Sequence, residues 1–115
     1  EKVIVRKVIV RKNEVIIIGT DTSTYFYYIK DRQAIFIIVA RTEKQAVFAE
    51  AILDKNDKPL SILMLIQNRD GKVRYMSIDK SDPENAPLYK AMEKQINEFV
   101  KKHKVKEILR QNGVE

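Results

Sequence analysis

Side chains that could carry out catalysis are few in this chain. The sequence contains one histidine, His103, and no cysteine, which excludes disulfide bonds and thiolate metal sites. A histidine that acts as a general base needs a carboxylate or a nucleophile held within reach. The sequence has no serine motif that would supply such a nucleophile. His103 lies in the basic run KKHK at the end of an expected helix, where cations complement the helix dipole. We therefore predict no catalytic residue and no cofactor, and the sequence favours a protein that is not an enzyme while leaving that question open.

Two acidic segments have spacings that metal sites use. DKNDKP at residues 54–59 has Asp and Asn at alternating positions, but Lys58 and Pro59 stand where a calcium loop needs glycine and further oxygen ligands. DKSDPE at residues 79–84 groups three carboxylates at a strand-to-helix junction, where such side chains can hold magnesium. Lys80 lies among them, and helix capping accounts for the last two carboxylates. We predict a polar turn and a helix cap here, and no metal site.

Basic side chains are concentrated at the two ends of the chain. The net charge is +6, of which residues 1–12 and residues 100–110 each carry +4, so that the remainder carries −2. If the fold brings the two ends together, they form one basic surface that attracts phosphates. The alternative is a surface that only keeps the protein solvated. The cations predicted to bind nucleic acid or another polyanion are Arg6, Lys7, Arg11, Lys12, Lys101, Lys102 and Lys104.

The run YFYY at residues 25–28 contains four of the nine aromatic residues. Alternate side chains of a strand share a face, so Tyr25 and Tyr27 would lie together. If that face were exposed beside the basic N-terminal strand, nucleobases could stack on both rings. The alternative is that both tyrosines are half-buried strand residues. We include Tyr25 and Tyr27 with the cations as candidate nucleic-acid-binding residues.

The elements that position these side chains fit one domain spanning residues 1–115. The chain has 15 Ile and 11 Val against 6 Leu, and this excess of branched residues favours strands. High Lys and Glu contents without cysteine suit a thermophile or a designed sequence. No apolar run approaches the roughly 18 residues of a membrane span, so we expect no membrane partner and a cytoplasmic location. The first residue is Glu1 rather than Met, so we expect a trimmed start, and the oligomeric state stays open.

Six segments are predicted to form strands. The runs VIIIG and LSILMLIQ are continuously apolar, a pattern typical of strands that are covered on both faces. The first segment repeats VIVRK twice, and an odd period places its two valine pairs on opposite faces. We expect a bulge near Arg6–Lys7 that restores one apolar face, or else a strand that is apolar on both faces. The predicted strands are 2–12, 15–19, 25–30, 34–41, 60–67 and 72–79.

Residues 42–55 decide between two fold predictions. Thr42 and Gln45 have the spacing of a helix capping box, and three alanines favour helix. We predict a central helix at 43–54 in an α+β fold with a largely antiparallel sheet of about six strands. If this segment is instead a strand, a seven-stranded curved sheet or barrel, similar to the pleckstrin-homology type, carries the C-terminal helix.

The C-terminal region is predicted to form an amphipathic helix at 83–103. Asp82 and Pro83 are a capping residue and a first-turn proline, and apolar residues then recur at helical spacing. Beyond Lys104, the apolar residues fall on nearly the opposite side of an ideal continuation. We therefore expect a break near His103–Lys104 and a short second helix that ends at Gly113.

One family resemblance rests on the order of these elements. Asp21 follows a buried strand, and two strands, a helix opening TEKQA and another buried strand come next. Over residues 14–67 this order resembles the first part of a ribonuclease H-like domain, and the resemblance implies carboxylates that hold two magnesium ions for phosphodiester cleavage. Asp21 matches the first-strand aspartate. The chain departs from the pattern because Val47 or Phe48 stands where the helix carboxylate is expected.

Three hypotheses about function follow from the sequence. The first is a non-catalytic binding module for nucleic acid or another polyanion, which uses the basic chain ends. The second is a structural or scaffold protein without a ligand. The third is a degenerate ribonuclease H-like, magnesium-dependent nuclease, which requires Asp21 to lie close to at least two other carboxylates.

Overall fold

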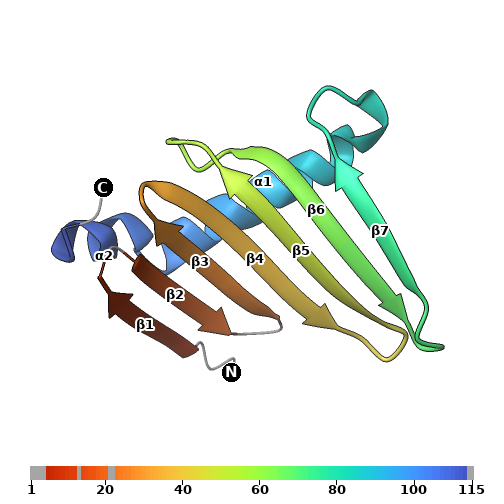
Figure 1. Cartoon of the computed structure of the whole chain (residues 1–115), viewed down its shortest axis with the longest axis horizontal. Coiled ribbons are helices and arrows are strands. Elements are labelled where there is room, and N and C mark those ends of the chain that lie inside the picture. Colours follow the sequence, from red (N-terminus) through yellow and green to blue (C-terminus); the bar gives the residue numbers. More distant parts are fainter. Residues whose placement is uncertain (1–4, 13, 21–22, 114–115) are drawn as a thin grey trace.

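The computed structural model describes residues 5–12, 14–20 and 23–113, and it contains one antiparallel sheet of seven strands (Figure 1). Each strand pairs with the next one along the chain, so the order in the sheet is the order in the sequence. The elements are β1 (Val5–Arg11), β2 (Glu14–Thr20), β3 (Thr24–Lys30), β4 (Gln33–Arg41), β5 (Gln45–Leu53), β6 (Pro59–Asn68), β7 (Val73–Ile78), η1 (Pro83–Asn85), α1 (Ala86–Lys102) and α2 (Val105–Gln111). α1 crosses behind the strands in Figure 1, and α2 follows it near β1. The α+β class and the antiparallel sheet are confirmed.

Residues 45–53 form a strand, so the prediction of a central helix at 43–54 is wrong. Ala49, Ala51 and Leu53 are buried, whereas the residues between them are half-buried. This period of two is that of a strand. β5 pairs with β4 along one side and with β6 along the other. The two ladders satisfy its backbone polar groups, and this pairing outweighs the helix propensity of the alanines.

Thr42, which was expected to cap that helix, closes the turn between β4 and β5. Its hydroxyl accepts hydrogen bonds from the backbone N–H groups of Lys44 at 3.3 Å and Gln45 at 3.1 Å. Its own N–H donates to the carbonyl of Gln45 at 2.8 Å. A capping box uses the same hydroxyl-to-backbone bond three residues along the chain. The same local chemistry therefore closes a hairpin here instead of starting a helix.

β1 is apolar on both faces, which was the alternative to the predicted bulge. Its pairing with β2 is continuous along the whole described strand, so the expected bulge at Arg6–Lys7 is absent there. Val8 and Val10 share the face of the sheet on which the helices pack, and Ile9 lies on the opposite face. β1 is also an edge strand of an open sheet, where charged side chains such as those of Arg6 and Lys7 discourage pairing with other chains.

The region predicted as one helix at 83–103 starts with the short helix η1, which Asp82 caps, and α1 follows from Ala86. The carboxylate of Asp82 accepts a hydrogen bond from the backbone N–H of Glu84 at 3.0 Å, and Pro83 occupies the first turn. α1 then buries four side chains at spacings of three and four residues, which is the period of a helix. These residues are Tyr89, Met92, Ile96 and Phe99.

The predicted break between the two helices lies at Lys104. This residue has a φ of 52°, in the left-handed region, and it turns the chain between α1 and α2. The turn brings Val105 and Leu109 into the same core as α1, with exposed fractions of 0% and 3%. A straight continuation of α1 would have carried these two side chains away from the sheet.

The two faces of the sheet differ in their cover. On the helix-covered face, the sheet residues pack against α1 and α2, and Ile17, Tyr27 and Phe36 form one fully buried row across it. The opposite face, here called the open face, is turned toward the viewer in Figure 1, with no described helix in front of it. Its central apolar residues are Ile18, Phe26, Ile37, Val39, Phe48 and Leu65.

Candidate functional site

The two basic ends of the chain meet at the junction between α1 and α2. Arg6 on β1 donates a hydrogen bond from Nη1 to the carbonyl oxygen of His103, at 3.2 Å, across a separation of 97 residues. That carbonyl belongs to the last turn of α1, where backbone oxygens lack partners within the helix. An arginine at this position therefore satisfies the helix end and also ties the edge strand to the helix. The sequence predicts one basic surface if the two ends of the chain come together, and in the structure Arg6 and His103 are in contact.

Gly19 on β2 lets the end of α1 come close to the sheet at this junction. A Cβ atom on Gly19 would lie 2.6 Å from Nε2 of His103 and 2.8 Å from Cε2 of Phe99. The His103 ring is buried, with 5% of the residue exposed, and it packs against the ring of Phe99 at 4.5 Å between centroids. His103 is thus part of the packing that positions the junction.

The seven predicted cations are all exposed, and we call this set the basic edge. Arg6 lies on the helix-covered face of β1 and Lys7 on the open face, because alternate strand residues point to opposite sides. Arg11 and Lys12 lie at the other end of the strand, roughly 20 Å away at the rise of a strand. The basic edge consists of Arg6, Lys7, Arg11, Lys12, Lys101, Lys102 and Lys104.

The two tyrosines predicted to stack with bases lie on the helix-covered face. Tyr25 is half-buried, and its ring packs against Phe36 at 6.1 Å and Phe99 at 6.0 Å between centroids. Tyr27 is 1% exposed. A buried ring cannot stack with a nucleobase, so the structure keeps Tyr27 away from the surface that carries the cations. Tyr27 is a core residue and Tyr25 packs against the core, which agrees with the alternative that both are buried or half-buried strand residues.

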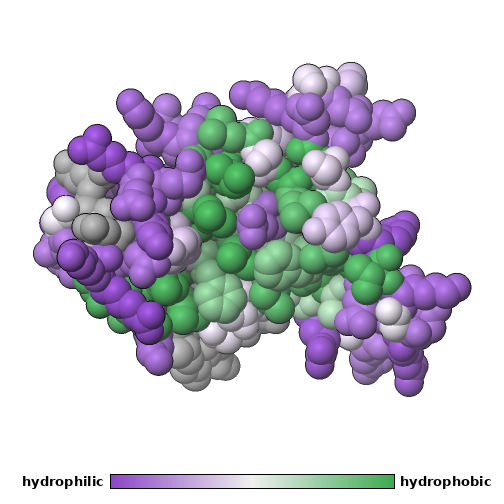
Figure 2. Space-filling model, viewed as in Figure 1, coloured by the Kyte–Doolittle hydropathy of each residue, from purple (hydrophilic) through white to green (hydrophobic). Residues whose placement is uncertain are grey.

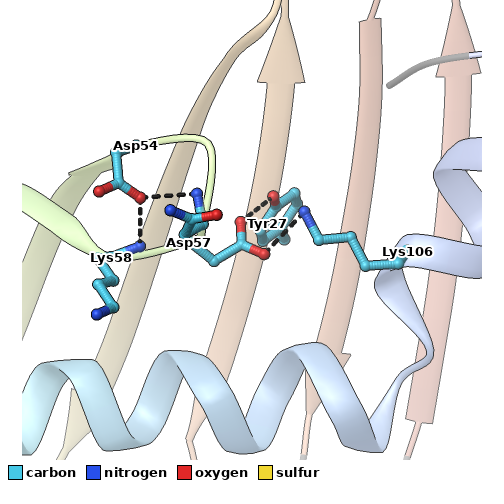
Figure 3. A network of polar contacts seen from close by, with 6 residues as sticks. Tyr27, Asp54, Asp57, Lys58 and Lys106 are labelled. Carbon is cyan, nitrogen blue, oxygen red and sulfur yellow. Dashed lines mark hydrogen bonds and ion pairs between the residues drawn. The ribbon is translucent and has the colours of Figure 1, made fainter.

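Tyr27 belongs to a polar network that sequence analysis missed. Its hydroxyl donates to Oδ1 of Asp57 at 2.6 Å, and Nζ of Lys106 lies 2.9 Å from Oδ2 of the same carboxylate (Figure 3). The three residues come from β3, the β5–β6 turn and α2. Burial, and then the hydrogen bond and the charge of Asp57, raise the pKa of the Tyr27 hydroxyl. The sequence signal was weak, because Asp57 was one of several polar residues in a turn.

The turn that presents Asp57 is held by the carboxylate of Asp54. Oδ1 of Asp54 accepts hydrogen bonds from the N–H groups of Asn56 at 2.8 Å and Lys58 at 3.0 Å (Figure 3). Both hydrogen bonds lower the pKa of the Asp54 carboxyl, and the one from Lys58 has the larger effect. Asp57 itself adopts a positive φ of 60°, which Asp tolerates better than most residues. The prediction of a polar turn is confirmed, and among the residues that the structure describes no acidic or histidine cluster could hold a metal ion.

A cavity of about 520 Å³ opens beside this network. Its apolar lining includes Ile29 and Leu109, and its charged lining consists of four cations and the carboxylates of Asp54 and Asp57, a net charge of +2. A site of this size and mixed lining suits a small group that carries negative charge. The four cations are Arg32, Lys55, Lys106 and Arg110.

The nuclease hypothesis finds no support in the fold. A ribonuclease H-like order requires the helix that the structure replaces with β5. Asp21, its first carboxylate, lies outside the described residues. Glu50, the carboxylate of β5, lies on the open face between Ile37 and Leu63 of the neighbouring strands.

No family model, curated protein or solved structure matches this chain. In the described part of the chain, neither helix combines the length and the apolar character that crossing a membrane requires.

Proposed function

We propose that this protein is a non-catalytic module that binds nucleic acid through its basic edge. The observation that carries the proposal is the hydrogen bond from Arg6 to the carbonyl of His103. It joins the described part of the first basic segment to the α1–α2 junction, so that cations of β1 and cations of that junction lie at one edge of the sheet. Clustered positive charge of this kind attracts a phosphate backbone at long range.

The chemistry of the basic edge favours phosphates over bases as its ligands. Its members are exposed lysines and arginines, whose ammonium and guanidinium groups bind phosphate oxygens. Tyr27 is buried and Tyr25 packs against the core, so no pair of stacked rings contributes sequence readout. We therefore expect binding with little sequence preference.

Salt dependence tests the electrostatic origin of binding. About four phosphate contacts to single-stranded DNA predict a slope near −3 for log K against log salt, or roughly a 50-fold loss of affinity between 50 and 200 mM. Fluorescence anisotropy with random single- and double-stranded oligonucleotides measures this slope. Affinity that does not respond to salt would contradict the proposal.

A matched pair of triple variants tests the location. K101Q/K102Q/K104Q removes three charges from the basic edge, and R69Q/K72Q/R74Q removes three exposed charges near β7, at the opposite edge of the sheet. We expect the first variant to bind at least tenfold more weakly at 50 mM salt, with a slope smaller by about 2. The second variant loses the same net charge, but at the β7 edge. It should therefore bind within about threefold of the wild type. Equal losses in both variants would overturn the proposed site.

A further inference from the structure

The open face of the sheet is a broad apolar surface. Figure 2 shows hydrophobic residues covering the middle of this side of the molecule, with hydrophilic residues around them. Val39 is 41% exposed and Tyr75 is 68% exposed, and the central residues between them in the sheet are half-buried. Contiguous apolar surfaces larger than a few hundred Å² on soluble proteins mark interaction sites.

The sequence pattern agrees with a second covering layer. The apolar runs in β2 and β6 are typical of strands covered on both faces, yet α1 and α2 cover only one. In β2, Ile16 and Ile18 remain half-buried while Val15 and Ile17 are fully buried. If the open face of β2 faced water, polar residues would be expected in place of Ile16 and Ile18.

The strands β1 to β5 offer enough area for a protein interface at the lower end of the standard range. These five strands have 7 to 9 residues each. At the spacing and rise of β-strands they cover a flat area of roughly 24 by 25 Å, or about 600 Å². Each partner in a standard interface contributes about 600 to 1,000 Å².

Two charges in the central part of the open face, those of Lys7 and Glu50, complement a second copy of the same face. Lys7, Ile18, Phe26, Ile37 and Glu50 form one row across β1 to β5. The base and the acid stand at the two ends of this row, about 19 Å apart at the spacing of strands, with Phe26 at its centre. A two-fold axis along β3 would place Glu50 of each copy opposite Lys7 of the other.

We propose that a second copy of this chain covers the strands β1 to β5 of the open face, forming a sheet-on-sheet dimer whose two-fold axis runs along β3. In such an isologous contact each pairing occurs twice, so Glu50 faces the partner's Lys7 and Lys7 faces the partner's Glu50. The apolar residues between them pack in two layers as in a β-sandwich. The helices of both copies lie outside. In the dimer Lys7 faces Glu50 of the other copy, so nucleic-acid binding uses the other six cations of the basic edge.

The mass of the full chain in solution tests the dimer. Sedimentation equilibrium between 1 and 100 µM should give twice the chain mass of 13.4 kDa. F26E, which places two carboxylates at the axis, should give a monomer with an unchanged circular dichroism spectrum. A wild-type monomer at 100 µM would overturn the proposal, since the face would then have another occupant. Dimerisation should persist at 1 M NaCl, where nucleic-acid binding is lost, so the two proposals fail separately.

A charge reversal tests the register of the two copies. Lys7 and Glu50 are too far apart to interact within one chain, so K7E and E50K should each raise the dimer dissociation constant at least tenfold by opposing like charges. The double variant K7E/E50K restores opposite charges only across the interface, and it should dimerise within about threefold of the wild type. A double variant as weak as the single ones would overturn the two-fold axis along β3.

Discussion

Folding takes the Tyr27 hydroxyl out of water and places it 2.6 Å from a carboxylate oxygen of Asp57. Burial first, and then Asp57, raise the pKa of this hydroxyl above its ordinary value of 10.0. In the unfolded chain the same hydroxyl loses its proton near pH 10. Its contribution to stability is therefore complete below pH 10 and decreases as the pH rises further.

The pH dependence of unfolding tests this contribution at the scale of one residue. Above pH 10 we expect Tyr27 to lower the free energy of unfolding by up to about 1.4 kcal/mol for each pH unit. Urea denaturation between pH 8 and 11 should show this slope in the wild type and a shallower slope in Y27F. Y75F, at a ring that is 68% exposed, is the control. Identical slopes in wild type and Y27F would contradict the role of Tyr27.

At the scale of elements, the approach of α1 to the sheet depends on the missing side chain of Gly19. In G19A the new Cβ would press on His103 and Phe99 at distances below 3.0 Å. We expect a loss of about 1 to 3 kcal/mol in the free energy of unfolding. H103A opens space beside the new methyl group, so the two substitutions should cost less together than the sum of their separate effects. Additive losses would show that the ring of His103 does not limit this approach.

The turn between α1 and α2 depends on a left-handed residue. Lys104 has a φ of 52°, which costs a residue with a Cβ about 1 kcal/mol that glycine avoids. Thermal unfolding should therefore show that K104G keeps or raises stability, by up to about 1 kcal/mol. K101G, within the last turn of α1, should lose about 1 kcal/mol. If K104G destabilised the protein as much as K101G, the break between the helices would lie elsewhere.

At the scale of the whole molecule, the sheet separates two kinds of surface. Its helix-covered face holds the core and, at the β1 side, the junction where Arg6 meets His103. Its open face is apolar across the central strands (Figure 2). Cations therefore line one edge while apolar side chains fill the face beside it. In the proposed dimer, β1 of each copy lies over β5 of the other, so the two basic edges lie on opposite sides of the assembly.

The sequence by itself determined the elements with strong local signals. The cap at Asp82, the helical spacing of α1, the break at Lys104 and most strands were predicted where they occur. Periodicity and turn chemistry act over a few residues, so they can be read without knowing the fold. The basic character of both chain ends was equally evident.

Only the tertiary structure decided which segments far apart in the sequence meet. It turned residues 45–53 into a strand, because two neighbouring ladders outweigh local helix propensity. It buried Tyr27 against Asp57 and Lys106, from turns and helices that no local pattern links. It also joined Arg6 to His103, and it covered one face of the sheet while leaving the other open. These outcomes depend on packing across the whole chain, which local sequence patterns do not encode.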